Sequence, residues 1–238
     1  MSSDPSPTAN PGPAARDDAA AGQPASAAVI PVRSLEGAKT RLGHVLDAEE
    51  RRDLVARLLR RTVGAARQAG VADIVVVSED DATRALAAAA GARAIGQRRR
   101  GLNAALGVGR DAALDAGAAT LVVLPGDLPL VDGESVAALF AAARPPAASD
   151  TDSLTDADEA VVVLVPDRHG RGTNALLLRP PDVIAFAFGA DSRATHARLA
   201  AEAGARYVEL ESPLSIDLDT PEDLLLVEDR LVELGHAG

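Results

Sequence analysis

Apolar and polar positions alternate along the chain in blocks that predict strands and helices in turn. Apolar runs of strand length occupy residues 27–32, 73–78, 92–95 and 121–127. The segments between them have the period of amphipathic helices and predict helices over 47–69, 81–90 and 103–116. Regular strand–helix alternation implies right-handed crossovers. We therefore expect an α/β fold with a mostly parallel sheet and helices on both faces.

The second half of the chain is less regular. The pattern there predicts a helix at 133–143, strands at 160–165 and 174–178, a helix at 192–203, a strand at 207–210 and a helix from Pro221. Residues 144–158 are rich in Pro, Ser, Thr and Asp and predict a surface loop. Residues 1–26 lack any apolar period and predict a disordered tail, which leaves 27–238 as a single domain.

Composition narrows the class of protein. Hydrophobic residues make up 47% of the 238 residues and aromatic residues only 2%, so the core must consist of Ala, Val, Leu and Ile. The absence of Cys excludes disulfides and cysteine-held metals, and it fits the reducing cytoplasm. The formal net charge of −11 argues against general binding to nucleic acids. No apolar run is long enough to span a membrane, so we expect no membrane partner.

A carboxylate follows the most apolar strand. The run 121–124 is succeeded by Pro125, Gly126 and Asp127. The carboxyl ends of strands form the ligand-binding edge of open α/β sheets, and a carboxylate there suits a hard cation such as Mg²⁺. An Asp that only caps the turn is the alternative, and this motif alone leaves both interpretations open.

Cations cluster after the first strand. Arg33, Lys39 and Arg41 lie close behind it, and Lys39 is the only lysine among 24 basic residues. Such cations suit phosphate groups, although the Walker pattern is absent. The triplet at 98–100 is either a solvated loop or a further phosphate contact.

Two aspartates lie near the C-terminus, in the sequence from Ser215 to Asp223. Thr220 and Pro221 predict a helix start, which leaves Asp217 without a structural role. We predict that Asp217 and Asp219 face opposite sides of an extended segment. Asp217 is therefore the candidate for a second metal ligand beside Asp127.

Two short segments could bind an anion through hydroxyl and backbone N–H groups. They are the turn at 170–174 and the segment from Phe188 to Ser192. A glycine turn and an ordinary helix cap are the simpler interpretations. His196, one turn further on, is interpreted as a surface histidine.

Six motifs occur in an order that resembles a known family. They are Pro31-Val32-Arg33 with Ala38-Lys39-Thr40-Arg41-Leu42, Gly101-Leu102-Asn103-Ala104-Ala105-Leu106, Leu124-Pro125-Gly126-Asp127-Leu128-Pro129, Gly172-Thr173-Asn174-Ala175-Leu176, Phe188-Gly189-x-x-Ser192 and Asp217-Leu218-Asp219-Thr220-Pro221. Together they resemble the phosphoenolpyruvate/2-phospho-L-lactate guanylyltransferase family of coenzyme F-420 biosynthesis. One departure is Arg33, where many members carry Lys.

The resemblance implies a fold, an activity and a site. The fold would be a Rossmann-like, GT-A-like three-layer sandwich shared with other nucleotidyltransferases. GMP would pass from GTP to phosphoenolpyruvate, giving enolpyruvyl-diphospho-5'-guanosine and pyrophosphate. The implied residues are Asp127 and Asp217 as Mg²⁺ ligands, Lys39 and Arg33 in catalysis, Arg33, Lys39, Arg41 and Asn103 at the nucleotide, and Thr173, Gly189 and Ser192 at the acid.

Several alternatives remain open at this point. The acceptor could instead be 2-phospho-L-lactate or 3-phosphoglycerate. A sugar-phosphate or molybdenum-cofactor-type nucleotidyltransferase is a further alternative, and a metal-dependent glycosyltransferase would also share the aspartate after the strand. A non-catalytic nucleotide-binding regulator is the alternative of a different class, which the two carboxylates disfavour. The oligomeric state is open between a monomer and a homodimer.

Overall fold

The computed structural model describes residues 25–35, 39–97, 100–145 and 159–227. A seven-stranded sheet runs through this part of the chain in the order β3-β2-β1-β4-β6-β5-β7. The strands are β1 (Ser26–Pro31), β2 (Asp73–Ser78), β3 (Arg93–Gly96), β4 (Thr120–Val123), β5 (Val161–Pro166), β6 (Thr173–Arg179) and β7 (Arg206–Glu209). Every neighbouring pair is parallel except the two pairs that include β6. The expected mostly parallel sheet is confirmed.

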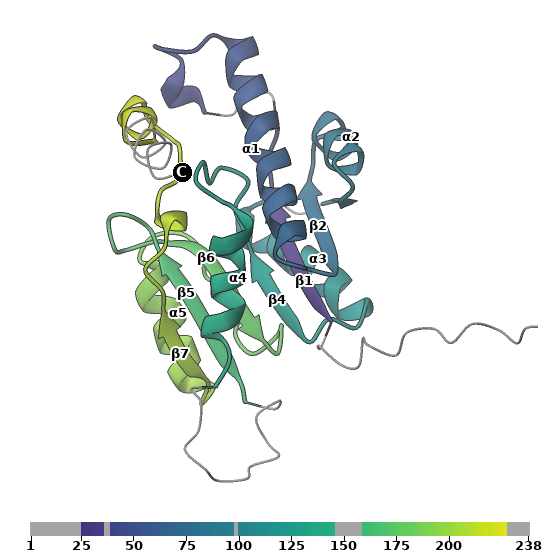
Figure 1. The fold of residues 1–238 in the computed structure, drawn as a ribbon, viewed down its shortest axis with the longest axis vertical. Coiled ribbons are helices and arrows are strands. Elements are labelled where there is room, and N and C mark those ends of the chain that lie inside the picture. The colour runs from purple at the N-terminus through teal and green to yellow at the C-terminus, as the bar shows by residue number, and fades with distance from the viewer. Residues whose placement is uncertain (1–24, 36–38, 98–99, 146–158, 228–238) are drawn as a thin grey trace, which may run out of the picture.

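Helices cover both faces of this sheet (Figure 1). On one face lie α1 (Ala48–Gln68), α2 (Asp81–Ala89) and α4 (Gly133–Ala142), and on the other lie α3 (Leu102–Asp115) and α5 (Ser192–Glu202). Each face has its own hydrophobic cluster of Ala, Val, Leu and Ile, packed between the helices and the sheet. The arrangement is a three-layer α/β/α sandwich.

The start of α1 follows from local sequence. Asp47 Oδ1 accepts hydrogen bonds from the backbone N–H groups of Glu49 (2.8 Å) and Glu50 (2.9 Å). Glu50 Oε2 in turn accepts from the Asp47 backbone N–H at 2.7 Å. This capping box satisfies N–H groups that have no partner within the helix. The predicted helix start at Asp47 is confirmed.

Some predicted boundaries differ from the observed ones. The strand expected to reach Asp127 ends at Val123, although the Leu124 N–H still donates to the Val29 carbonyl of β1 at 3.0 Å. Ser26, which the sequence placed in the tail, is the first residue of β1 and pairs with Thr120 of β4. Residues 221–227 are helical, as predicted from Pro221. The rest of the predicted tail, at 1–24, and the loop segment 146–158 lie outside the described residues.

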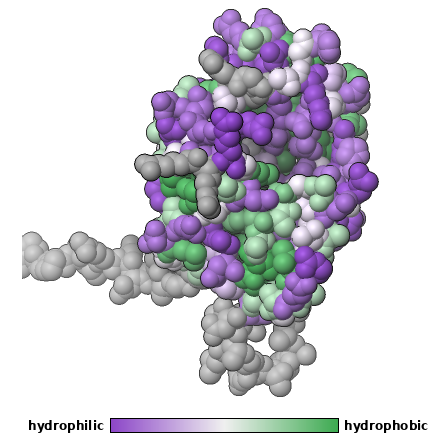
Figure 2. All heavy atoms as spheres, turned by 180° about the vertical axis from the view of Figure 1, so that it is seen from behind, coloured by the Kyte–Doolittle hydropathy of each residue, from purple (hydrophilic) through white to green (hydrophobic). Residues whose placement is uncertain are grey.

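The surface opposite to the view of Figure 1 is hydrophilic over most of its upper half, with hydrophobic residues gathered lower down (Figure 2). Among the described residues, no helix combines the length and the apolar character that crossing a membrane requires.

Candidate active site

The loop after β4 carries Asp127 to the end of the neighbouring strand β1. Leu124 and Leu128 are fully buried on either side of the turn and fix its ends in the core. Between them Gly126 passes so close to the segment after β1 that a Cβ atom there would lie 2.8 Å from Val32 Cγ2. Only glycine fits that approach without moving the loop, so Gly126 sets the place where the Asp127 carboxylate emerges.

Asp217 and Asp219 reach the same place from the far end of the chain. The backbone N–H of Leu218 donates to the Asp127 carbonyl at 3.1 Å, which joins the two segments directly. The Leu218 side chain, only 2% exposed, packs in a small cluster with Leu42 and Leu130. One oxygen from each of Asp127, Asp217 and Asp219 lies within 4.8 Å of the other two.

The prediction that Asp217 and Asp219 face opposite sides is therefore wrong. Residues two apart in an extended chain lie on the same face, and the residue between them lies on the other. Here Leu218 occupies the buried side, and both carboxylates join Asp127. Asp219 was not among the predicted metal ligands. The apolar Leu218 between the two acids was the sequence signal that places both carboxylates on the same face.

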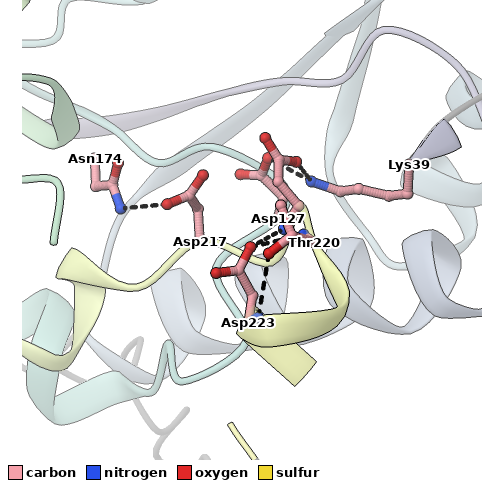
Figure 3. Close-up of polar contacts among 7 residues, drawn as sticks. Lys39, Asp127, Asn174, Asp217, Thr220 and Asp223 are labelled. Carbon is pink, nitrogen blue, oxygen red and sulfur yellow. Dashed lines mark hydrogen bonds and ion pairs between the residues drawn. The ribbon is translucent and has the colours of Figure 1, made fainter. Parts of the chain in front are cut away.

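Lys39 bridges two of the three carboxylates. Its Nζ lies 2.8 Å from Asp127 Oδ2 and 2.6 Å from Asp219 Oδ1, and its side chain is 9% exposed (Figure 3). Burial alone would lower the Lys39 pKa, but the charges and hydrogen bonds of the two aspartates outweigh it and raise the pKa above its ordinary value. The ammonium group is therefore held charged between them. Lys39 also has a φ of 54°, in the left-handed region that side chains rarely adopt.

Asp217 faces the group from the other side. Asn174 Nδ2 on β6 donates to Asp217 Oδ1 at 3.4 Å (Figure 3). Burial, followed by the negative charge of Asp127, raises the pKa of Asp217, while the bond from Asn174 opposes that rise. Three carboxylates thus lie close together, the Lys39 ammonium group pairs with only two of them, and the excess negative charge favours a further cation. A set of donors made only of carboxylate oxygens fits a hard divalent cation such as Mg²⁺.

A helix cap fixes Asp219 in place. Asp223 Oδ2 accepts from the backbone N–H groups of Asp219 (2.8 Å) and Thr220 (2.7 Å), and Thr220 Oγ1 accepts from the Asp223 N–H at 3.3 Å. Asp223 is 2% exposed and forms an ion pair with Arg168 from the hairpin between β5 and β6. The predicted role of Thr220 as a helix cap is confirmed, and the cap holds Asp219 as well.

A cleft of about 960 Å³ extends from these acids along the ends of β1, β2 and β4. Asp127, Asp219 and Lys39 stand at one part of its wall. The remaining lining includes the cations Arg33 and Arg100, the polar residues Glu79, Asp80 and Gln97, and apolar residues such as Leu102 and Phe188. Among the predicted site residues, the cleft brings together Arg33, Lys39 and Asp127.

Other predicted site residues lie outside the wall of this cleft in the described part of the chain. Arg41 is exposed beside Lys39, while Thr173 and Ser192 are buried, at 8% and 1% exposed. Gly189 follows the cleft residue Phe188, and Asn103 binds the backbone of that same phenylalanine. Their expected contacts with substrates remain predictions.

The interpretation of His196 as a surface histidine is wrong. Its side chain is fully buried, because α5 packs against β5 and β7 and turns this residue toward the sheet. Both ring nitrogens have hydrogen-bonding partners.

The fold is one found in solved structures described as nucleotidyl and nucleotide-diphospho-sugar transferases. The chain is similar to a putative nucleotide-diphospho-sugar transferase from Desulfovibrio desulfuricans (TM-score 0.64, 20% identity, covering 85% of each chain). It is also similar to a nucleotidyl transferase from Methanothermobacter thermautotroptrophicus (TM-score 0.59, 18% identity, covering 90% of this chain and 100% of the other). At these identities the likeness concerns the fold.

Sequence comparison identifies the particular family. The family described as "Guanylyl transferase CofC like" matches residues 26–228, so the chain belongs to it. A phosphoenolpyruvate guanylyltransferase from Rubrobacter xylanophilus is 44% identical over 202 residues, which cover 84% of this chain and 92% of that protein. Another from Chloroflexus aggregans is 44% identical over 201 residues, covering 82% and 93%.

Proposed function

We propose that this protein transfers GMP from GTP to phosphoenolpyruvate, forming enolpyruvyl-diphospho-5'-guanosine and releasing pyrophosphate. The convergence of Asp127, Asp217 and Asp219 with Lys39 beside a large cleft carries the proposal. Membership in the guanylyl transferase family and the names of the relatives supply the substrates.

The reaction requires that the substrates be positioned and that negative charge be stabilised, and it does not require a general base. An oxygen of the acceptor phosphate attacks the α-phosphorus of GTP, a new P–O bond forms, and the bond to pyrophosphate breaks. A phosphate monoester has its second pKa near about 6, so at neutral pH the attacking oxygen is already largely ionised. A site without a general base therefore suffices, and stabilising the developing charge supplies most of the catalysis.

The three aspartates would hold Mg²⁺, a cation that supplies positive charge next to phosphate oxygens. Lys39 neutralises part of their charge through its ion pairs with Asp127 and Asp219. We propose that when triphosphate enters, this ammonium turns to it and stabilises the departing pyrophosphate. A single rotatable ammonium can exchange carboxylate partners for phosphate oxygens in this way.

The remaining assignments concern residues in the cleft wall and beside it. Arg33 lies in the wall and would bind phosphate, with Arg41 close by in the sequence. Asn103, which binds the backbone of the cleft residue Phe188, would contact the nucleotide. Thr173, Gly189 and Ser192 would bind phosphoenolpyruvate through hydroxyl and backbone donors. We further propose that residues 27–238 form one domain, since strands from both halves share one sheet. The absence of Cys fits a place in the cytoplasm.

The test is an assay that varies both substrates. The protein with Mg²⁺ would be given GTP, ATP, CTP or UTP together with phosphoenolpyruvate, 2-phospho-L-lactate, 3-phosphoglycerate or a sugar phosphate. Released pyrophosphate would be measured, and the product would be identified by mass spectrometry. We expect turnover with GTP and phosphoenolpyruvate. Nucleotide binding with no pyrophosphate from any acceptor would instead indicate a regulator.

Substitutions connect the activity to the proposed site. Asp127→Asn, Asp217→Asn and Asp219→Asn should each remove several kcal/mol of transition-state stabilisation, or about a thousandfold or more in turnover. The matched control Asp182→Asn changes an exposed aspartate that follows β6 and is not among the residues lining the cleft, and it should leave the rate unchanged. Full activity in any one of the three variants would remove that aspartate from the proposed metal site.

A further inference from the structure

His196 occupies a buried position between the two segments that carry the proposed acceptor ligands. Its Nδ1 lies 3.1 Å from Thr173 Oγ1 at the start of β6. Its Nε2 accepts a hydrogen bond from the backbone N–H of Ala187 at 3.0 Å. The two ring nitrogens therefore connect β6 with the loop that leads to Gly189 and Ser192.

These contacts determine which nitrogen carries the proton. A backbone N–H can only donate, so Nε2 must present its lone pair to Ala187 and cannot hold a proton. Burial lowers the pKa of His196 to about 4, so the ring is neutral at pH 7. A neutral imidazole carries one proton, and here it must lie on Nδ1. Nδ1–H thus donates to Thr173 Oγ1.

The orientation of the Thr173 hydroxyl follows from that tautomer. The oxygen accepts from His196, so the hydroxyl hydrogen has to point away from the ring. Thr173 is 8% exposed and precedes Asn174, whose amide binds the carboxylate of Asp217. An anionic oxygen needs donors, and a hydroxyl that accepts from His196 with one of its two lone pairs can donate its hydrogen to such an oxygen.

The same ring also holds the loop. Asn103 binds both backbone groups of Phe188, donating from Nδ2 to the carbonyl at 3.0 Å and accepting from the N–H at 2.9 Å. The Phe188 ring meets the His196 ring edge-on with centroids 5.1 Å apart. Ala187 and Phe188 are thus fixed by side chains from α5 and α3, immediately before Gly189.

We propose that His196 is a positioning residue for the phosphorylated acceptor: its Nδ1–H turns the Thr173 hydroxyl into a donor aimed at the anion, while its Nε2 anchors the loop before Gly189. This rests on the proposed function, in which Thr173 and Gly189 bind the acceptor. The histidine itself does not touch the substrate. It acts through Thr173 and through the Ala187 backbone.

The tautomer can be measured on the unmodified protein. Nitrogen-15 NMR of histidine-labelled protein without substrates should show one of the four histidines in the Nδ1–H form, and this signal should not titrate between pH 8 and about 5. His196→Gln identifies the signal by its absence. A His196 resonance in the Nε2–H form, or one that titrates near 6.5, would overturn the proposal.

A double-mutant cycle tests the action through Thr173. His196→Gln keeps an acceptor within reach of the Ala187 N–H but removes the donor on the Nδ1 side, and Thr173→Val removes the hydroxyl at nearly constant shape. Thr173→Val should raise the KM for the acceptor by about tenfold to a hundredfold, the loss of one hydrogen bond to a charged group. His196→Gln alone should raise it by a smaller factor.

The double variant decides the matter. If His196 acts through the hydroxyl, adding His196→Gln to Thr173→Val should raise the acceptor KM no further, and the KM for GTP should stay within about twofold throughout. Factors that multiply, or equal losses for GTP and the acceptor, would mean that His196 only stabilises the fold. If the wild-type protein does not use phosphoenolpyruvate, the proposed function fails. The NMR experiment still tests the His196 tautomer in that case. The double-mutant cycle is then measured with whichever phosphorylated acid the protein turns over.

Discussion

Two glycines in α3, two residues apart, offer a test of how packing sets the cleft. A Cβ on Gly109 would lie 2.4 Å from Val29 Cγ1 on β1 and 3.2 Å from Val77 Cγ2 on β2. A Cβ on Gly107, in the same helix, would have nothing within 4 Å. Carbon atoms pack best at roughly 3.5–4.0 Å, so Gly109→Ala must push α3 away from the sheet by about 1 Å.

The two variants gain the same helix propensity, but only Gly109→Ala is overpacked against the sheet. Each gains about 0.8–1 kcal/mol of helix propensity when Ala replaces Gly. Gly109→Ala additionally suffers overpacking, which costs typically about 1–3 kcal/mol. We therefore expect Gly107→Ala to be more stable than the wild type. Gly109→Ala should be less stable than Gly107→Ala by about 1–3 kcal/mol, because the gain in helix propensity is the same in both variants and cancels in this difference.

The displacement should also reach the cleft, because α3 carries Leu102 and Ala105 in its wall. Urea unfolding gives the free energies, and initial rates give the KM for GTP in both variants. Gly109→Ala should raise that KM, whereas Gly107→Ala should not. Equal stability of the two variants would refute the close packing of α3 on β1.

Three further outcomes follow from the contacts of single residues. Lys39→Met should increase the affinity of the protein for Mn²⁺ several-fold, as measured by calorimetric titration without substrates. The reason is that an ammonium group no longer competes with the metal for Asp127 and Asp219. Weaker Mn²⁺ binding by the variant would contradict this prediction. Asp223→Ala removes the acceptor for two backbone N–H groups and should lower the free energy of unfolding by about 1–2 kcal/mol together with the Mn²⁺ affinity, a result that an unchanged melting curve would exclude. Burial lowers the pKa of His196 from 6.5 to about 4. As the pH falls, the unfolded chain therefore binds a proton at this histidine before the folded protein does. The folded protein loses stability relative to the unfolded chain between pH 6.5 and 4 for this reason. That group should make the protein about 2 kcal/mol less stable at pH 5 than at pH 7, and His196→Gln should lack this part of the pH dependence in urea unfolding.

Local sequence determined most of the elements. The capping box at Asp47 and Glu50 and the apolar strands fixed where helices and strands form, since caps and side-chain periodicity act over a few residues. Alternation of strands and helices was enough to predict the layered sheet. The position of Asp127 could also be predicted from the sequence, because a carboxylate after a buried strand lies at the ligand-binding edge of an open α/β sheet.

The tertiary structure alone decided which groups meet. The hydrogen bond from Leu218 to the Asp127 carbonyl joins segments about ninety residues apart, and no periodicity within either segment encodes it. The sequence predicts that Lys39 binds phosphate, whereas the structure shows its ammonium group paired with two aspartates. His196 looks like a surface residue on a polar helix, and its burial follows only from the way α5 lies against the sheet. Sequence patterns report the conformation of neighbours along the chain, whereas charge pairing and burial depend on residues brought together by the folding of the whole sheet.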